Sequence, residues 1–220
     1  MPTSTVENYI KQIYIAQQPK QNDLLPMGVL AAIMGVAPGT ATSMVKALAD
    51  SGLVLYEPRS GIRLTRGGEQ LALHVLRRHR ILELFLVRIL GLNWSEVHEE
   101  AEHLEHVVSD KVLERMDSLL GNPQFDPHGD PIPDAQGQVG TEQLINLAQA
   151  TDGLHAEIAR VSDQDGAFLQ FAEKKGLKPG THVNVSIQDN HADSIVLKIE
   201  NRSSVALGGK AASKIFLRPV

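Results

Sequence analysis

Apolar residues near the start of the chain repeat at helical spacing in three short segments. A first helix is expected from Ser4, which has capping-box spacing to Glu7, until about Gln18, because a proline follows. The stretch MGVLAAIMGVAPGTATSMVKALADSGLV (27–54) then predicts a helix, a tight glycine turn and a second helix that stops at a glycine. The residues LVLYEPRSGIRLT (53–65) predict two short strands around a turn. This order of elements indicates a winged helix-turn-helix.

Two long amphipathic helices are expected next, from Gly67 to about Leu90 and from Ser95 to about Leu120. Their apolar surface is larger than the core of one chain needs there, which indicates a helix-to-helix dimer. Residues 120–140 hold four prolines and four glycines, so we expect a linker or an extended loop.

After residue 140, strand-like segments are separated by turn residues. The segments HAEIARVS, THVNVSIQ, DSIVLKIE and KIFLRPV alternate or run apolar at strand length, and one short helix is expected at about 167–175. Four or five short strands in roughly 70 residues predict a small, strongly bent β-barrel. The fold class is therefore mainly α with a small β domain.

Composition narrows the chemistry that the chain can perform. The 220 residues include no cysteine, which excludes disulfides, thiolate nucleophiles and cysteine zinc sites. No apolar run is long enough to span a membrane and the N-terminus lacks a secretory signal, so we expect a cytoplasmic protein. Lys and Arg outnumber Asp and Glu by 9 to 5 in residues 1–80, whereas residues 81–125 hold 3 against 9. A basic first third suits nucleic acid, and an acidic middle suits cations.

The second helix of the helix-turn-helix presents small polar side chains, which suit insertion into a major groove. The candidate DNA contacts are Pro38, Gly39, Thr40, Thr42, Ser43, Lys46, Arg59 and Arg63. The first three form a helix start suited to a phosphate, and the two arginines of the hairpin are placed to contact phosphates. From this pattern alone, a small helical domain without a nucleic-acid role is the alternative, and Lys46 is equally compatible with a plain surface lysine.

The stretch VHEEAEHLEH (97–106) packs four glutamates and three histidines into ten positions. On a helix at 100° per residue, two carboxylates and two imidazoles share an arc of about 100°. These residues are His98, Glu102, Glu105 and His106, and His79 and Glu83 lie one turn apart on the preceding helix. Carboxylate and imidazole donors without sulfur suit Mn²⁺ or Fe²⁺. A solvated helix face is the simpler alternative, and a di-metal oxidase would need a second Glu-x-x-His that the chain lacks.

The chain resembles the diphtheria toxin repressor family of metal-dependent transcriptional regulators. The resemblance rests on TVENYIKQIY, VAPGTATSMVKALADSGLV, RRHRILELFLVRILGL, VHEEAEHLEHVVSD and DPHGDPIP, which together cover essentially the whole chain. It implies a winged helix-turn-helix DNA-binding domain (1–73), a helical metal-binding and dimerisation domain with a Pro/Gly linker (74–140) and a C-terminal SH3-like, FeoA-like domain (141–220).

The resemblance also implies two metal sites in each subunit. One would use His79, Glu83 and His98, completed by the SH3-like domain, where the candidates are Asp163, Gln164 and Asp165. The other would use Glu102, Glu105 and His106 with Asn8 of the first helix. The glutamate at position 102 resembles the manganese-sensing branch of the family, since iron-sensing members tend to have cysteine at that position. Asn8 stands where manganese sensors usually have Asp, and Lys11 where some have Glu.

These expectations describe a metal-activated, homodimeric repressor of metal-homeostasis genes rather than an enzyme. A Mn²⁺ or Fe²⁺ ion would neutralise the acidic stripe and tie it to the first helix through Asn8, so that two recognition helices meet operator DNA together. A carboxylate–histidine metalloenzyme and a DNA-binding regulator that senses an organic ligand are the alternatives. Titrating divalent ions while following DNA binding separates the three.

Overall fold

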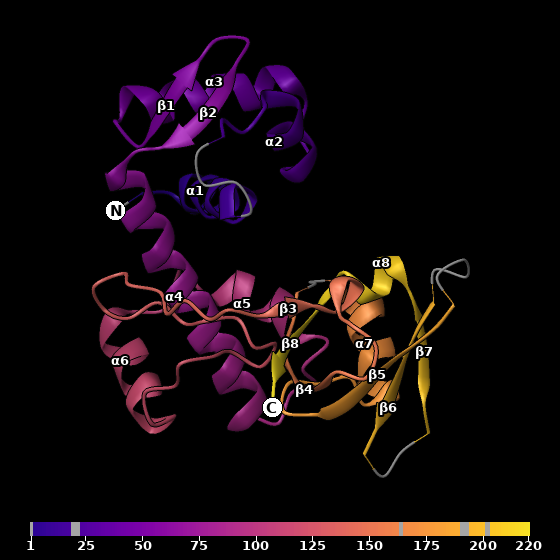
Figure 1. The fold of residues 1–220 in the computed structure, drawn as a ribbon. Helices are drawn as coiled ribbons and strands as arrows, with labels where there is room; N and C mark the ends of the chain where they lie inside the picture. Colours follow the sequence, from indigo (N-terminus) through magenta and orange to yellow (C-terminus); the bar gives the residue numbers. More distant parts are fainter. Residues whose placement is uncertain (1, 19–22, 163–164, 190–193, 201–202) are drawn as a thin grey trace. The chain divides into compact units, whose positions relative to one another are not determined.

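The structure is a computed structural model that describes residues 2–18, 23–162, 165–189, 194–200 and 203–220 (Figure 1). Its contacts divide the chain into two compact units. The first unit comprises Met1–Arg78, Glu105–Val107 and Pro133–Gln138, and the second comprises His79–Leu104, Val108–Ile132 and Val139–Val220. Each unit has its own buried hydrophobic residues.

The first unit contains the expected helix-turn-helix. Its helices are α1 (Ser4–Gln17), α2 (Met27–Ile33) and α3 (Pro38–Asp50). Thr3 caps α1 by accepting a hydrogen bond from the backbone N–H of Val6, one residue before the predicted cap at Ser4. The buried apolar residues of α3 are Ala41, Val45 and Leu48, which leaves the small polar residues between them on the outer side.

The second helix, α2, buries a narrower face than its sequence indicates. Leu30 and Ala31 are buried, whereas Val29 and Ile33 are 46% and 42% exposed. A helix of only two turns packs one narrow stripe against its neighbours, so Val29 and Ile33 lie outside the buried face although they are apolar at helical spacing.

A two-stranded hairpin follows α3 and forms the predicted wing (Figure 1). β1 (Val54–Glu57) pairs antiparallel with β2 (Gly61–Leu64). In the turn, the backbone N–H of Ser60 donates to the carbonyl of Glu57 and Arg59 has a φ of 71°. A side chain with a Cβ is strained in this left-handed region by about 1 kcal/mol relative to glycine.

The helical region after the wing differs from the prediction at one point. α4 (Arg66–Arg88) matches the first predicted long helix, but the second is interrupted and forms α5 (Val97–Leu104) and α6 (Asp110–Leu119). Ser109 caps α6 by accepting from the backbone N–H of Val112, and such a cap competes with continuation of the preceding helix. Glu105 and His106 therefore lie in a turn, and the helical arc of about 100° does not describe their positions.

The C-terminal part of the second unit is a six-stranded antiparallel sheet with the strand order β3-β8-β4-β5-β6-β7 (Figure 1). The strands are β3 (Ile145–Asn146), β4 (His155–Val161), β5 (His182–Asp189), β6 (Ser194–Ile199), β7 (Val205–Gly208) and β8 (Ile215–Pro219). The helical segments are η2 (Leu147–Gln149), α7 (Gly166–Lys175) and α8 (Gly209–Ala212). The four predicted strands and α7 are confirmed, whereas the short strands β3 and β7 were not predicted.

Residues 120–132 form the irregular structure that was expected, but they are not a solvated linker. One carboxylate oxygen of Asp126 accepts hydrogen bonds from the backbone N–H groups of His128 and Asp130, at 2.8 and 2.9 Å, which closes a tight turn. Gly129 has a φ of 86°, and a Cβ there would lie 2.0 Å from the carbonyl oxygen of Ala159 on β4. The turn is therefore packed against the sheet, with the side chains of Asp126 and His128 buried.

Among the described residues, no single helix combines the length and the apolar composition needed to cross a membrane. α2 and α3 pass that test only as a pair that is bent by 105°.

Candidate metal centre and nucleic-acid interface

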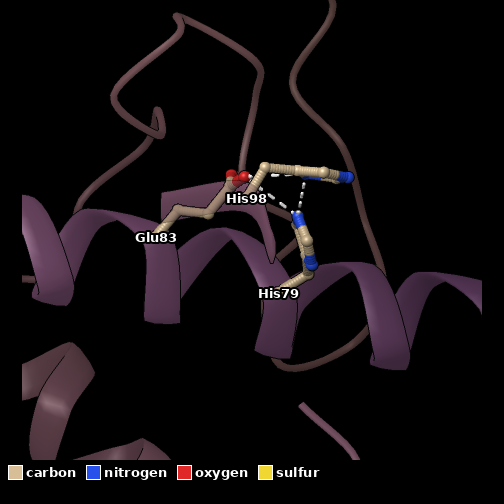
Figure 2. Close-up of side chains that lie close together, drawn as sticks. All are labelled: His79, Glu83 and His98. Atoms are coloured by element: carbon tan, nitrogen blue, oxygen red, sulfur yellow. Dashed lines mark hydrogen bonds and ion pairs between the residues drawn. The ribbon is translucent and has the colours of Figure 1, made fainter. Parts of the chain in front are cut away.

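Three side chains of the second unit bring their donor atoms to one point (Figure 2). His79 and Glu83 project from successive turns of α4, and His98 of α5 faces them. His79 Nε2 lies 3.0 Å from both Glu83 Oε1 and His98 Nδ1, and His98 Nδ1 lies 3.2 Å from Glu83 Oε1. His79 and Glu83 are buried and His98 is half-buried, so water is largely excluded from this group.

This triangle of donor atoms fits one face of a coordination octahedron. With metal–donor bonds of about 2.1 Å, neighbouring donors lie about 3.0 Å apart in an octahedron and about 3.4 Å apart in a tetrahedron. The observed edges of 3.0, 3.0 and 3.2 Å match the octahedral spacing. Two imidazoles and a carboxylate in that arrangement suit Mn²⁺ or Fe²⁺.

Glu83 is held in its ionised form although it is buried. Burial alone would raise the pKa of the Glu83 carboxyl, but the charge of His79 and hydrogen bonds from His79 and His98 hold it well below its ordinary value. Glu102 adds a second carboxylate nearby, since its Oε1 lies 3.6 Å from His98 Nε2 and 3.9 Å from His79 Nδ1. Within the second unit, the structure thus places Glu102 beside His79 and His98.

Two residues that the sequence did not single out extend this group. Asp126 and His128, in the tight turn after α6, lie close enough to Glu83 that the three could hold one cation. His128 Nδ1 is 3.9 Å from Glu83 Oε2, while its Nε2 lies 2.9 Å from the carbonyl oxygen of Trp94. The motif DPHGDPIP contained the signal, because an Asp and a His two residues apart in a proline-rich loop are a pair of donors on a rigid support.

A second group of donors lies in the first unit, where the turn after α5 contacts α1. His106 Nε2 lies 2.8 Å from Asn8 Oδ1 and 3.4 Å from Glu105 Oε1, so three predicted ligands converge there. On its other side, His106 Nδ1 lies 2.6 Å from Glu7 Oε2. A carboxylate on one ring nitrogen fixes the tautomer and leaves the other nitrogen free to bind a cation. Glu7, which the sequence indicated only as part of a capping box, therefore lies where it can orient the His106 ring.

Glu105 also contacts a positively charged side chain of α1. The Lys11 ammonium lies 2.6 Å from Glu105 Oε1, and the exposed fractions of the two side chains are 2% and 0%. A buried charge without a partner is strongly destabilising, so Lys11 and Glu105 each allow the other to be buried in its charged form.

Of the three candidate metal ligands in the C-terminal domain, only Asp165 lies among the described residues. Asp163 and Gln164 lie outside the described residues. Asp165 is exposed and caps α7, with its carboxylate accepting a hydrogen bond from the backbone N–H of Ala167 at 3.0 Å.

The candidate DNA contacts lie on the outer side of the first unit. Pro38, Gly39, Thr40, Ser43 and Lys46 of α3 are exposed, Thr42 is half-buried, and Arg59 and Arg63 are exposed on the wing. The hydroxyls of Thr42 and Ser43 donate to the carbonyls one turn earlier, at 2.8 and 3.0 Å. In this state both hydroxyls offer acceptor lone pairs to an approaching ligand rather than donors.

The buried Asp126 carboxyl gives a first testable prediction. Burial, with the charges of Asp130 and Glu83, raises its pKa well above the ordinary value. A group with a raised folded pKa contributes full stability below the unfolded pKa of about 3.9 and loses it as the pH rises through the folded pKa. In a chelator, Asp126→Asn should therefore gain thermal stability relative to the wild type as the pH is raised from 4 to 8, as followed by circular dichroism.

Asp134 provides the matched control for this experiment. Its carboxylate also accepts two backbone N–H groups, from Gln136 and Gln138, but the residue is exposed. Asp134→Asn should show no such gain at high pH. Equal pH profiles for Asp126→Asn and the wild type would contradict the prediction.

Three family models match successive parts of the chain. Residues 1–62 match the family model "Iron dependent repressor, N-terminal DNA binding domain", residues 65–134 match "Iron dependent repressor, metal binding and dimerisation domain", and residues 145–219 match the FeoA domain. The diphtheria toxin repressor of Corynebacterium glutamicum is 33% identical over 216 residues, which cover 92% of this chain and 91% of that protein. A manganese-dependent transcriptional repressor solved in complex with manganese is 40% identical with a TM-score of 0.89, covering 98% of this chain and 100% of the other. The repressor ScaR, solved with bound Zn²⁺, is 31% identical with a TM-score of 0.81 over the full length of both chains. The chain therefore belongs to the iron-dependent repressor family of metal-dependent transcriptional regulators, with a DNA-binding domain, a metal-binding and dimerisation domain and a FeoA domain.

Proposed function

We propose that this protein is a homodimeric repressor, not an enzyme, which binds operator DNA of metal-homeostasis genes in the cytoplasm when a divalent ion is bound. The observation that supports this best is the triangle of His79, Glu83 and His98, whose donor atoms have the spacing of an octahedral face. The same chain presents a helix-turn-helix and wing with exposed polar residues.

The ion is proposed to be Mn²⁺ or Fe²⁺. His79, Glu83 and His98 would hold one ion, and Asn8, Glu105 and His106 would hold another. Both groups consist of imidazole and oxygen donors, and no sulfur donor is available in a chain without cysteine. The bound ion supplies positive charge that neutralises the carboxylates around it, and the chain's own residues determine what that charge does.

The second group explains how an ion can affect DNA binding. Asn8 and Glu7 belong to α1 of the DNA-binding region, whereas Glu105 and His106 follow α5 directly in the chain. Glu7 holds the His106 ring so that Nε2 and Asn8 Oδ1 converge. Fixing the turn after α5 against α1 restricts the orientation of the helix-turn-helix, which favours simultaneous contact with two half-sites. A coupling of this kind is typically worth about 5- to 150-fold in affinity.

The wing turn gives a prediction in which stability and DNA affinity move in opposite directions. Arg59→Gly removes a strained left-handed side chain and should stabilise the fold by up to about 1 kcal/mol. The same change removes a positive charge proposed to contact a phosphate, so DNA affinity should fall and its salt dependence should become shallower by about one unit. Thermal melting and DNA titrations at several salt concentrations measure the two effects, and unchanged DNA affinity would contradict the proposed contact.

The proposed dimer interface uses helices of the second unit. Several large apolar side chains on or next to α4, α5 and α6 are exposed, namely Ile89, Leu90, Leu104, Val112 and Leu119, with exposed fractions between 37% and 65%. We infer that another subunit covers these side chains in the proposed dimer.

A charge in this surface should separate the subunits. Leu119, at the end of α6, is 65% exposed, and Leu119→Glu should raise the dimer dissociation constant by about 10- to 100-fold, because burying an apolar side chain of this size contributes roughly 1.5–3 kcal/mol. Light scattering after size-exclusion chromatography measures the mass. Phe171→Glu on α7, at a residue 36% exposed, is the matched control and should remain dimeric.

One experiment tests the proposed function as a whole. Binding of the full chain to DNA fragments is followed while Mn²⁺, Fe²⁺ or Zn²⁺ is titrated, with chelator as the reference. A rise in affinity for specific fragments with the dimer as the binding species supports the proposal, whereas DNA binding that ignores all three ions contradicts it. The two imidazoles and one carboxylate also resemble the facial triad of non-haem iron enzymes, so oxygen uptake with Fe²⁺ and no effect on DNA would favour the metalloenzyme alternative.

A further inference from the structure

Trp94 is the only tryptophan of the chain, and its side chain lies against a histidine of the metal centre. It is 4% exposed, in the loop between α4 and α5. Its indole stacks on the imidazole of His128, with 5.0 Å between the ring centroids and 30° between the ring planes. Residues that orient a metal ligand affect the affinity for the ion, so this contact bears on metal binding.

The polar atoms of His128 are held from several sides. Its backbone N–H donates to Asp126 Oδ1 at 2.8 Å, and its carbonyl accepts from the backbone N–H of Val161 on β4 at 2.9 Å. Its Nε2 lies 2.9 Å from the carbonyl oxygen of Trp94, so the neutral ring carries its proton on Nε2. Nδ1 then keeps its lone pair and lies 3.9 Å from Glu83 Oε2. Two ligands of one ion, with bonds of about 2.1 Å, lie at most about 4.2 Å apart, so both atoms can reach the same ion.

The indole of Trp94 does not act through its N–H group. Within the described part of the chain, its Nε1 atom is buried and has no hydrogen-bond partner. Trp94 belongs to the apolar cluster of the C-terminal domain, where leucine or phenylalanine would fill space without leaving a buried N–H unpaired. The faces of the ring are therefore what distinguishes Trp94 from an ordinary core residue.

A second contact joins the indole to the C-terminal domain. The ammonium group of Lys178, between α7 and β5, lies 5.2 Å from the centroid of the Trp94 ring, which is within the range of a cation–π interaction. The same ammonium group pairs with Glu173 of α7 at 2.6 Å. Trp94 thus connects the C-terminal domain with His128, and this connection requires no ligand atom from that domain.

We propose that Trp94 is a positioning residue for His128, because its carbonyl and its ring together hold the imidazole with Nδ1 facing Glu83. Through the indole, the C-terminal domain raises the affinity of this group for a divalent ion. The inference rests on the proposed function, since it assumes that an ion binds at Glu83. The orientation of the His128 ring can nevertheless be tested without metal.

The first measurement therefore uses the full chain in chelator. With ¹⁵N-labelled histidine, above the pH range in which imidazoles protonate, NMR shows which ring nitrogen carries the proton, and His128→Gln identifies the signal. The wild type should show one tautomer with the proton on Nε2. Trp94→Leu keeps the backbone carbonyl but loses the stacked ring, so both tautomers should appear. A proton on Nδ1 in the wild type, or a single Nε2 tautomer in Trp94→Leu, would overturn the inference.

The second measurement separates metal affinity from stability. Trp94→Leu should weaken Mn²⁺ binding by at least about tenfold, as expected for loss of a residue that supports a ligand. Leu207→Ala is the control, because Leu207 on β7 is 2% exposed and belongs to the same apolar cluster. It should lower the melting temperature in chelator but change Mn²⁺ affinity by less than about twofold. Equal losses of affinity in the two variants would show that affinity merely follows the stability of the domain.

Lys178→Glu keeps the test decisive if Trp94→Leu does not fold. The Lys178 side chain is 42% exposed, so the fold should tolerate the change. Without the cation beside the indole, Mn²⁺ affinity should fall about two- to fivefold, the value of a cation–π contact at a partly exposed site. Lys175→Glu, an exposed change of equal charge on α7, should leave the affinity unchanged. The same affinity in Lys178→Glu and Lys175→Glu would contradict the connection to the C-terminal domain.

The outcomes also distinguish this inference from the proposed function. Wild-type Mn²⁺ affinity in a folded Trp94→Leu would contradict the role of Trp94 alone. Wild-type DNA binding that does not respond to any ion would contradict the proposed function, whatever the Trp94 and Lys178 variants do.

Discussion

The Glu83→Gln substitution is expected to weaken Mn²⁺ binding at the His79–Glu83–His98 group by more than about 100-fold. Removing a residue that only supports a metal ligand costs up to about 100-fold in affinity, and Glu83 is proposed to bind the ion directly. Glu83 provides the one carboxylate of the triangle, and its Oε1 contacts both imidazoles at 3.0 and 3.2 Å. Glutamine has nearly the same shape but carries no charge, so packing on α4 is retained while the charge that attracts the ion is lost. Isothermal titration calorimetry with Mn²⁺ measures the change.

The control for this variant is Glu100→Gln on α5. Glu100 is exposed and lies in the same acidic stretch, so its replacement removes equal charge without touching the group. It should change Mn²⁺ affinity by less than about twofold, as expected for a surface charge that is screened by solvent. Similar losses in both variants would mean that general acidity, and not the triangle, attracts the ion.

Glu83 also fixes the sign of the pH dependence without metal. Because its folded pKa is held well below the ordinary value, its contribution to stability is present above the unfolded pKa of about 4.3 and is lost only as the pH falls through the depressed folded pKa. Acidification should also weaken metal binding, since a protonated imidazole cannot bind a metal.

The elements that the sequence predicted well are those whose signals are local. The turn at Gly35, the proline start of α3 and the alternation around the wing turn each depend on a few neighbouring residues. The same holds for β4, β5, β6 and β8, whose residues alternate or run apolar at strand length. Two-residue β3 has too few positions for any period to show.

The errors arise where a specific contact, and not the apolar pattern or the composition, determines the structure. The apolar and charged pattern continues across Glu105–Ser109, so periodicity predicted one helix where Ser109 begins a new one. High proline and glycine content indicated a linker, whereas the turn is anchored by Asp126 and packed against β4 through Gly129. The burial of Lys11 could not be predicted from α1 alone, because its partner Glu105 is 94 residues away.

The positions of the two donor groups indicate that ions bound there would have different effects. Donors of the first group all lie on α4 and α5, so an ion there joins two helices of the second unit. Donors of the second group come from α1 and from the turn after α5, so an ion there acts on the unit that contains the helix-turn-helix. We therefore expect the first group to stabilise the helical region and the second to control DNA affinity.

His106→Ala is accordingly expected to abolish the response of DNA binding to metal while leaving binding in chelator unchanged. His106 is the residue through which both Glu7 and Asn8 of α1 contact the turn after α5, at 2.6 and 2.8 Å. Without its ring, the site loses its imidazole and the contacts of Glu7 and Asn8 with the turn after α5, so a coupling of about 5- to 150-fold should fall to about one. Fluorescence anisotropy of labelled DNA, with and without saturating Mn²⁺, gives the ratio of the two DNA affinities directly.

His103→Ala removes an exposed imidazole from the same stretch and should keep the wild-type ratio. By linkage, DNA should tighten Mn²⁺ binding in His103→Ala but not in His106→Ala, and a reciprocal effect that survives in His106→Ala would show that the coupling passes through other residues.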